Sequence, residues 1–122
     1  MDVMTINAKQ VISEKIPAEK SLEYFQGVVG GLIQYLPFPV EGVDAFVNDE
    51  GKFLGWQNLA GEYVEGLPYN ETATVIMSNA GLLFPNDWIA GPMVLSACND
   101  EGETVGLTES QKQAIRELVE GA

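Results

Sequence analysis

The chain contains no histidine, a single cysteine and only six lysine and arginine residues in a length of 122. Without histidine it has neither a Ser/His/Asp triad nor an imidazole metal site, and one cysteine forms no internal disulfide or thiolate cluster. No apolar run approaches the ~18 residues of a membrane span. The opening MDVMTINAKQ also lacks the basic and apolar regions of a signal peptide. We therefore expect a cytoplasmic protein without membrane contact.

Cationic side chains are missing from almost half of the chain. Between Phe53 and Gln111 there is no lysine or arginine, and the formal charge of the whole chain is −12. The same stretch holds eight carboxylates: Glu62, Glu65, Glu71, Asp87, Asp100, Glu101, Glu103 and Glu109. Such a charge repels nucleic acid and anionic lipid and attracts basic protein surfaces. We expect no direct binding to nucleic acid.

The apolar content is that of a folded protein. Hydrophobic residues make up 46% of the chain and charged residues 20%, whereas disordered acidic chains lack the apolar surface that offsets ordering entropy. At this length we expect one globular domain spanning residues 1–122.

Apolar stretches predict the strands. Residues 3–6 and 11–16 alternate and are typical of one long strand or a strand pair. Further strands are predicted at residues 32–36, 43–47, 52–54, 87–89 and 92–98. Residues 43–47 and Met93–Cys98 are expected to be the central strands of the sheet.

Capping signals predict the helices. Ser21–Val29 places apolar residues at helical spacing before Gly30, and a short helix is expected to start near Asn70. Thr108 and Gln111 match a capping box that opens a closing helix, Glu109–Glu120. The fold class is therefore α+β, with a mainly antiparallel sheet of five to six strands and two to three helices on one face.

The tetrapeptide Asn-Asp-Glu-Gly occurs twice, at residues 48–51 and 99–102. Its oxygens are of the type that calcium and magnesium prefer. Each copy, however, follows an apolar strand and ends in glycine, as hairpin turns do, and neither has the ligand series of an EF-hand loop. We interpret both copies as turns and predict no metal site.

Nothing in the sequence favours catalysis. Cys98 lies in the apolar run MVLSAC without a neighbouring base, so we expect it to be buried and unreactive. The many carboxylates do not form a pair within an apolar frame that would separate their pKa values. We therefore predict no catalytic residues, no cofactor and no enzymatic activity.

Four short motifs follow one another in the chain: LEYFQGVVGGLI at residues 22–33, VNDEGK at 47–52, LPYN at 67–70 before Ala73-Thr74, and DWIAG at 87–91. In this order they resemble a family of small phage, plasmid and bacterial domains called domain of unknown function 3846. Its members read roughly LQ-x-x-VGG-x-I, NEEGK, LP-x-N and D-x-I-x-G. The resemblance covers residues 10–98, and residues 99–122 add a turn and the C-terminal helix.

The resemblance implies a small α+β fold, a mobile-element origin and hence a bacterial host cell, and it implies no catalytic residues. The positions Asn48, Gly51, Pro68, Asn70 and Gly91 are interpreted as turn and cap residues. This chain departs from the pattern in having Asp49 where glutamate is usual, in an insertion at residues 55–66 and in a longer tail after Gly102.

Charge and resemblance together predict a non-enzymatic counter-defence inhibitor. Its acidic surface would imitate DNA, as an anti-CRISPR protein can, and dock on the basic nucleic-acid-binding site of a host CRISPR or restriction nuclease. The expected contact residues lie in the inserted stretch and the second turn: Glu62, Glu65, Asp100, Glu101 and Glu103, with Trp56 as an apolar anchor. The sequence does not decide whether the chain forms a homodimer through a sheet edge.

The alternative is a pocket protein that sequesters a small nucleotide signal. Phosphate binding needs cationic or helix N-terminal donors, and Lys52 and Arg116 would then line a deep pocket. Clustering of the carboxylates on one surface would instead favour docking on a basic partner. A third interpretation is that the acidic side chains only keep the protein soluble and bind no partner.

Overall fold

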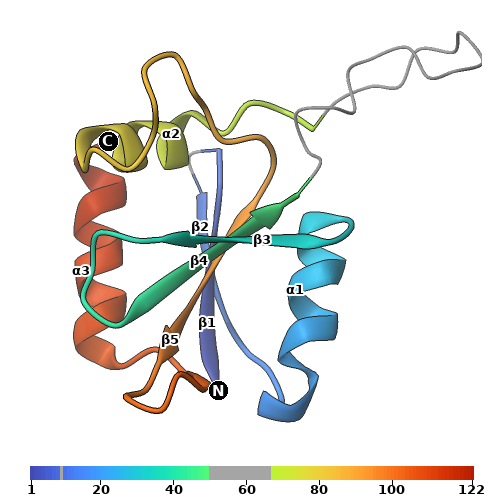
Figure 1. The fold of residues 1–122 in the computed structure, drawn as a ribbon. Helices are drawn as coiled ribbons and strands as arrows, with labels where there is room; N and C mark the ends of the chain where they lie inside the picture. The colour runs from blue at the N-terminus through green and yellow to red at the C-terminus, as the bar shows by residue number, and fades with distance from the viewer. Residues whose placement is uncertain (9, 50–66) are drawn as a thin grey trace, which may run out of the picture.

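A computed structural model describes residues 1–8, 10–49 and 67–122 of the chain. It contains one antiparallel sheet of six strands in the order β2-β1-β5-β4-β3, with β6 also paired to β5 (Figure 1). The strands are β1 (Asp2–Asn7), β2 (Gln10–Lys15), β3 (Ile33–Pro37), β4 (Val43–Asn48), β5 (Met93–Cys98) and β6 (Thr104–Val105). The predicted antiparallel α+β fold is confirmed, and residues 3–6 and 11–16 form a strand pair.

β5 lies at the centre of the sheet. Leu95 is opposite Met4 of β1 on one side and Ala45 of β4 on the other. Near the end of β5, Ala97 pairs with Val105, so β6 continues the sheet where β1 stops. All residues of β5 except Cys98 are buried, because helices cover both faces of this strand. β4 is its neighbour and also internal, which confirms the two predicted central strands.

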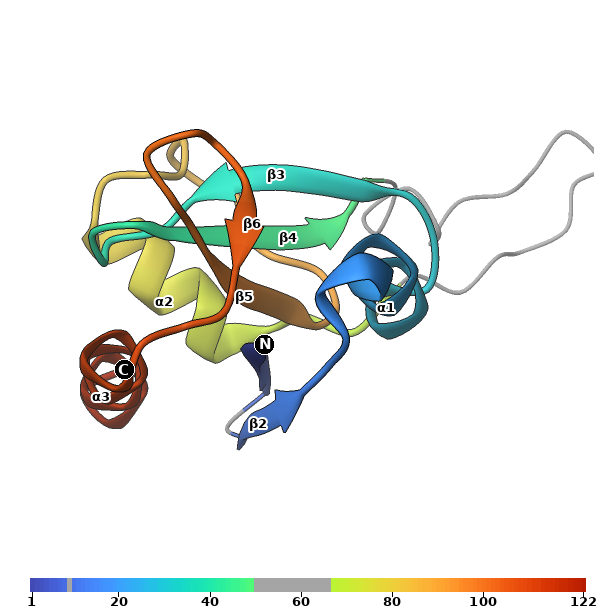
Figure 2. The same cartoon turned by 90° about the horizontal axis from the view of Figure 1, so that it is seen from below.

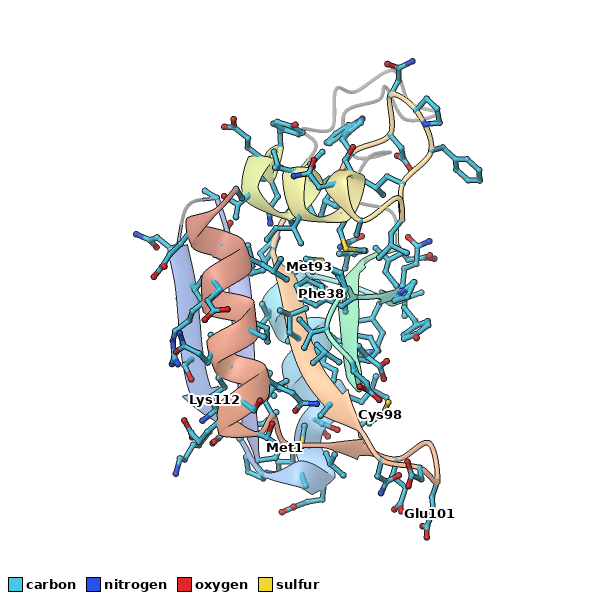
Figure 3. All side chains as sticks on the ribbon, turned by 90° about the vertical axis from the view of Figure 1, so that its left-hand side faces the viewer. Met1, Phe38, Met93, Cys98, Glu101 and Lys112 are labelled. Atoms are coloured by element: carbon cyan, nitrogen blue, oxygen red, sulfur yellow. The ribbon has the colours of Figure 1, made fainter. Side chains whose placement is uncertain are left out.

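Two helices cover one face of the sheet. These are α2 (Glu71–Asn79) and α3 (Glu109–Glu120), and they enclose the larger core with Met93 and Phe38 (Figure 3). Ile115 of α3 and Met77 of α2 are fully buried in it. Burying an aliphatic side chain contributes roughly 1.5–3 kcal/mol, so this layer supplies much of the stability.

The remaining helix covers the opposite face. A 3-10 turn, Ala18–Lys20, leads into α1 (Ser21–Val29), which packs on Val3 and Val94 through Phe25 and Val29. The rings of Phe25 and Phe46 stack with their centroids 4.8 Å apart. Figure 2 shows α1 on one side of the sheet and α2 and α3 on the other. The expectation that the helices share one face is therefore wrong for α1.

The predicted caps are present. The Thr108 hydroxyl accepts from the Gln111 backbone N–H, while the Gln111 side chain accepts from the Thr108 N–H. Asn70 is the N-cap of α2, and Gly30 ends α1 in the left-handed conformation with φ 82°. A helix starting after Asn70 is thus confirmed.

One predicted strand is absent. Residues 87–89 form no strand, and the nearby backbone contributes only an isolated bridge between Tyr69 and Ala90. The N–H of Ile89 donates to the Thr74 hydroxyl instead of to a neighbouring strand. The predicted strand at residues 52–54 and the turn at Gly51 lie outside the described residues.

Within the described ranges, none of the helices is both long and apolar enough to cross a membrane.

Candidate functional site

Three of the predicted contact residues meet on one hairpin. Asp100, Glu101 and Glu103 lie in or beside the turn between β5 and β6, and all three are exposed. Figure 3 shows Glu101 at the tip of this turn, projecting away from the body of the domain. The second Asn-Asp-Glu-Gly is therefore a hairpin turn, as predicted.

Asn99 holds the turn in shape. Its side-chain oxygen accepts from the backbone N–H of Glu101 at 3.0 Å and of Glu103 at 2.9 Å. Its side-chain nitrogen donates to the Glu103 carboxylate at 3.2 Å. Gly102 adopts φ 79° and donates its N–H to the Asn99 carbonyl. The Asn99 side-chain oxygen accepts from backbone N–H groups further along the chain, so this is an Asx turn.

Among the described residues, cationic side chains do not neutralise this turn. In the parts of the chain that the structure describes, none of the three acids forms an ion pair. Lys112 of α3 instead contacts Asp2 at 2.5 Å and Glu109 at 2.9 Å. The hairpin therefore presents a local negative charge to solvent.

The sheet beside the hairpin adds a further carboxylate. Asp44 of β4 pairs with Ser96 of β5 and lies near Cys98 and Tyr35. Burial, followed by the charge of Asp44, raises the pKa of the Cys98 thiol, and Asp44 is the main cause that raises the pKa of Tyr35. Cys98 is half-buried, because it is the last residue of β5, so the expectation of full burial is wrong.

The other expected contact residues, Glu62, Glu65 and Trp56, lie outside the described residues. The chain leaves the described part at Asp49, directly after β4, and re-enters it at Leu67. Because β4 and β5 are antiparallel, Asp49 and the Asn99 turn lie at opposite ends of the strand pair.

A pocket of about 260 Å³ lies at the Asp49 end of the sheet. Its walls come from β3, the end of β4 and the loop before β5: Gln34, Leu36, Val47, Asn48, Asp49, Leu83, Asp87, Trp88, Ile89 and Ala90. Leu36 and Val47 belong to the core beneath α2 and α3, so the pocket opens on that face, beside the edge strand. The patterns in the sequence did not predict this pocket.

Asn70 fixes the backbone around the pocket. This side chain is only 1% exposed, and its amide nitrogen donates to the carbonyls of Ile6 and Gly91, each at 2.9 Å. Its oxygen accepts from the Ala73 N–H at 3.2 Å. One asparagine thus joins β1, α2 and the loop before β5.

Two more positions from the quoted motifs have local structural roles. Gly91 adopts φ 77°, and a Cβ there would lie 2.8 Å from the Leu67 side chain. The Asn48 side chain donates to the Val29 carbonyl at 2.9 Å and ties β4 to the end of α1. The motifs 47–52, 67–70 and 87–91 each contribute residues to this end of the domain, and that convergence is the signal that could have located the pocket.

Of the two cations predicted to line a nucleotide pocket, the structure describes one, Arg116, so this alternative stays a prediction. Lys52 lies outside the described residues, and Arg116 is exposed on α3 and is not part of the pocket wall. The described wall carries Asp49 and Asp87 and no lysine or arginine. Within the described residues there is also no cluster of three or more histidine, cysteine or carboxylate side chains suited to a metal ion.

Fold and surface define a small α+β domain with a six-stranded antiparallel sheet, an acidic hairpin at one end and a small pocket at the other. The family model for Domain of unknown function (DUF3846) matches residues 1–120, and the chain belongs to this family. The match is wider than the motifs at residues 10–98 and takes in β1, the hairpin and α3. Neither the curated proteins nor the solved structures contain a match to the chain.

Proposed function

We propose that this protein is a non-enzymatic binding protein whose acidic hairpin docks on a basic surface of another protein. The observation that carries the proposal is the exposed, rigidly built turn with Asp100, Glu101 and Glu103, none of which pairs with a cation among the described residues. A turn held by its own hydrogen bonds loses little conformational freedom on binding.

The partner class follows from the charge. A surface that binds nucleic acid is basic, and a carboxylate cluster imitates the phosphates that such a surface attracts. The mobile-element origin that the family resemblance implies points to a host defence protein, such as a CRISPR or restriction nuclease. Complementary charge mainly raises the association rate, which suits an inhibitor that competes with DNA.

The Cys98 end of β5 supports the hairpin as a docking surface. Asp44 extends the negative charge from the turn onto the sheet, and Tyr35, which is 56% exposed, supplies an aromatic side chain beside it. Tyrosine is enriched among the residues that contribute most to interfaces. Trp56 stays the sequence-based prediction for the apolar anchor.

The test compares two variants that change the net charge equally. Lysine replaces Asp100, Glu101 and Glu103 in the first, and Glu19, Glu117 and Glu120, all exposed, in the second. Tagged proteins are used to capture partners from a bacterial host lysate at low and high salt. We expect the hairpin variant to lose the proteins that wild type captures at low salt, and the control variant to keep them.

For a captured protein, association is then followed at increasing salt. Screening within ~10 Å at 0.1 M should slow the association rate of wild type. Unchanged capture by the hairpin variant, or association that is insensitive to salt, would contradict the proposal.

A further inference from the structure

β2 forms one edge of the sheet, and solvent reaches its outer side. Among the described strands it pairs with β1 alone, and all of its residues except Val11 are exposed. Figure 2 shows no described helix or strand on the outer side of β2. Its register with β1 runs without a bulge from Asp2 opposite Lys15 to Asn7 opposite Gln10. β2 is therefore a regular edge strand with nothing from the described chain covering it.

The hydrogen-bonding pattern shows which backbone groups of β2 point outward. The Ile16 N–H donates to the Met1 carbonyl and the Met1 amino group donates to the Ile16 carbonyl, so these residues form a hydrogen-bonded pair. Such pairs alternate with non-bonded pairs along an antiparallel ladder. The N–H and C=O groups of Val11, Ser13 and Lys15 therefore point away from β1. Within the described residues, none of these groups has a hydrogen-bond partner.

The opposite edge of the sheet is protected against pairing. In β3 the outward residues are Ile33, Tyr35 and Pro37, because the Asp49 N–H donates to the Leu32 carbonyl and fixes the alternation. Proline has no N–H, so the outer side of β3 lacks one of its donors. Natural sheets use proline in edge strands to prevent pairing with other chains. β2 contains no proline, so its edge is the better template for a further strand.

Charge indicates which partner suits this edge. Residues 1–20 hold three carboxylates and three lysines, so their net charge is zero and residues 21–122 carry the whole −12. Two copies of an acidic protein repel each other over most of their surfaces. The β2 edge belongs to the neutral segment, so a second copy of the chain can approach it with little repulsion. The charged residues of this segment are Asp2, Glu14 and Glu19 against Lys9, Lys15 and Lys20.

We propose that two copies of the chain pair through β2 as an antiparallel dimer with two-fold symmetry. Such symmetry places one residue of the strand opposite its own copy, and Ser13 is the middle one of the three outward residues. With Ser13 on the axis, Val11 of each copy lies opposite Lys15 of the other, so all three outward residues gain backbone partners. An axis at Glu14 would instead set two carboxylates directly against each other, which is destabilising.

The register centred on Ser13 also places Ile12 of each copy opposite Glu14 of the other. Ile12 is 44% exposed in the single chain, and the second copy covers part of this side chain. The dimer depends on β2 alone, so it forms whether or not the acidic hairpin binds a basic partner.

Opposite charges at position 12 test this register. Ile12→Glu faces Glu14 of the other copy, and this repulsion occurs twice in a symmetric dimer. We therefore expect the dissociation constant of the dimer to rise about tenfold or more. Ile12→Lys loses the same apolar side chain but brings the opposite charge, so it should stay dimeric. Sedimentation equilibrium over a range of protein concentrations measures the wild type and both variants.

Ser13→Pro tests the backbone pairing. The Ser13 N–H points outward, so proline there removes a donor to the second copy and none to β1. We expect this variant to be folded by circular dichroism and monomeric by sedimentation. If Ser13→Pro does not fold, the two Ile12 variants still decide the question, because they change an exposed side chain and no backbone group.

A cysteine on the symmetry axis provides an independent readout. In a Cys98→Ser background, Ser13→Cys lies opposite its own copy and should form a disulfide-linked dimer on mild oxidation. Gln34→Cys in the same background is the matched control, because Gln34 is an exposed residue of the other edge strand, β3. We expect the control to stay monomeric.

A wild type that is monomeric at every concentration, or a dimer that neither Ile12→Glu nor Ser13→Pro weakens, would overturn the proposal. Cross-linking through Gln34→Cys in place of Ser13→Cys would do the same. The hairpin proposal is tested with other residues and another readout, so either proposal can fail alone.

Discussion

The Lys112 ammonium lies 2.5 Å from the Asp2 carboxylate, and 110 positions separate the two residues in the chain. Glu109 contacts the same ammonium at 2.9 Å. The Lys112 side chain is only 8% exposed, so the pair fixes the start of α3 against the first strand. Breaking a buried pair by removing one partner is destabilising, because the other charge stays uncompensated.

This pair makes stability depend on pH at both extremes. The hydrogen bond from Lys112 lowers the pKa of Asp2, so its stabilisation is complete above the ordinary aspartate pKa and is lost as pH falls through the lowered value. The bonds to Asp2 and Glu109 raise the pKa of Lys112, whose contribution is lost only as pH rises through that raised value. We expect Asp2→Asn to reduce the urea midpoint near neutral pH and to have a smaller effect in acid.

Urea unfolding of wild type and Asp2→Asn across the acid range measures this effect. Glu120→Gln on the exposed end of α3 is the control and should change neither the midpoint nor its pH dependence. A constant difference between wild type and Asp2→Asn at every pH would contradict the assignment.

Asn70→Ala should be strongly destabilising. It removes an N-cap, which contributes ~0.5–2 kcal/mol, and leaves two buried carbonyls, on Ile6 and Gly91, without their donor. Each lost buried bond costs ~1–3 kcal/mol. Asn70→Ser keeps a neutral N-cap acceptor for the Ala73 N–H and loses the amide donors, so chemical denaturation of the two variants separates the cap from the cross-links. Equal, small losses of unfolding free energy in the two variants would show that Asn70 does not hold β1, α2 and the loop before β5 together.

Thr108→Ala should cost about 1 kcal/mol of unfolding free energy through loss of the cap. The hydroxyl accepts from the Gln111 N–H at 3.1 Å, and Thr108→Ser retains that acceptor. We expect the serine variant to unfold at nearly the wild-type denaturant concentration. If the serine variant lost as much stability as the alanine variant, the hydroxyl would not be the stabilising group.

Cys98 should react slowly with thiol reagents. Burial and the charge of Asp44 raise its pKa, so little thiolate forms near neutral pH. Asp44→Asn removes the nearby negative charge, which should bring the pKa of Cys98 closer to its ordinary value and speed labelling at a fixed mildly alkaline pH. The labelling rate of the two proteins over a pH series measures this, with Asp49→Asn at the far end of β4 as the control. An unchanged rate in Asp44→Asn would assign the slow reaction to burial alone.

Local patterns predicted most of the elements but not their arrangement. Alternation, the Thr108 capping box and Gly30 each depend on neighbouring residues, and the structure agrees with all three. The sheet face on which α1 lies, relative to α2 and α3, depends on whether β5 is buried on both of its faces. The apolar run of β5, interrupted only by Ser96, is typical of such a strand, and this signal was available in the sequence.

The strand predicted at residues 87–89 is absent for a different reason. Trp88 and Ile89 are large apolar residues, as in a strand, but the Ile89 N–H bonds to the Thr74 hydroxyl of α2, and no pattern within 87–89 encodes a distant side chain. The candidate pocket was not predicted for the same reason, since Asp49 and Asp87 come to line one pocket only through tertiary structure. The hairpin acids, in contrast, are close in sequence and were predicted as a group.

The central position of β5 has a consequence for how the chain folds during synthesis. The β1–β2 and β3–β4 hairpins each join neighbouring segments, but β5 alone links them. Until residues 93–98 have emerged from the ribosome, the two hairpins have no common partner, and their inner edges, β1 and β4, expose unpaired backbone. Unpaired strand edges recruit other chains, and contacts between distant segments form slowly. The nascent protein is therefore most open to misassembly just before β5 is made.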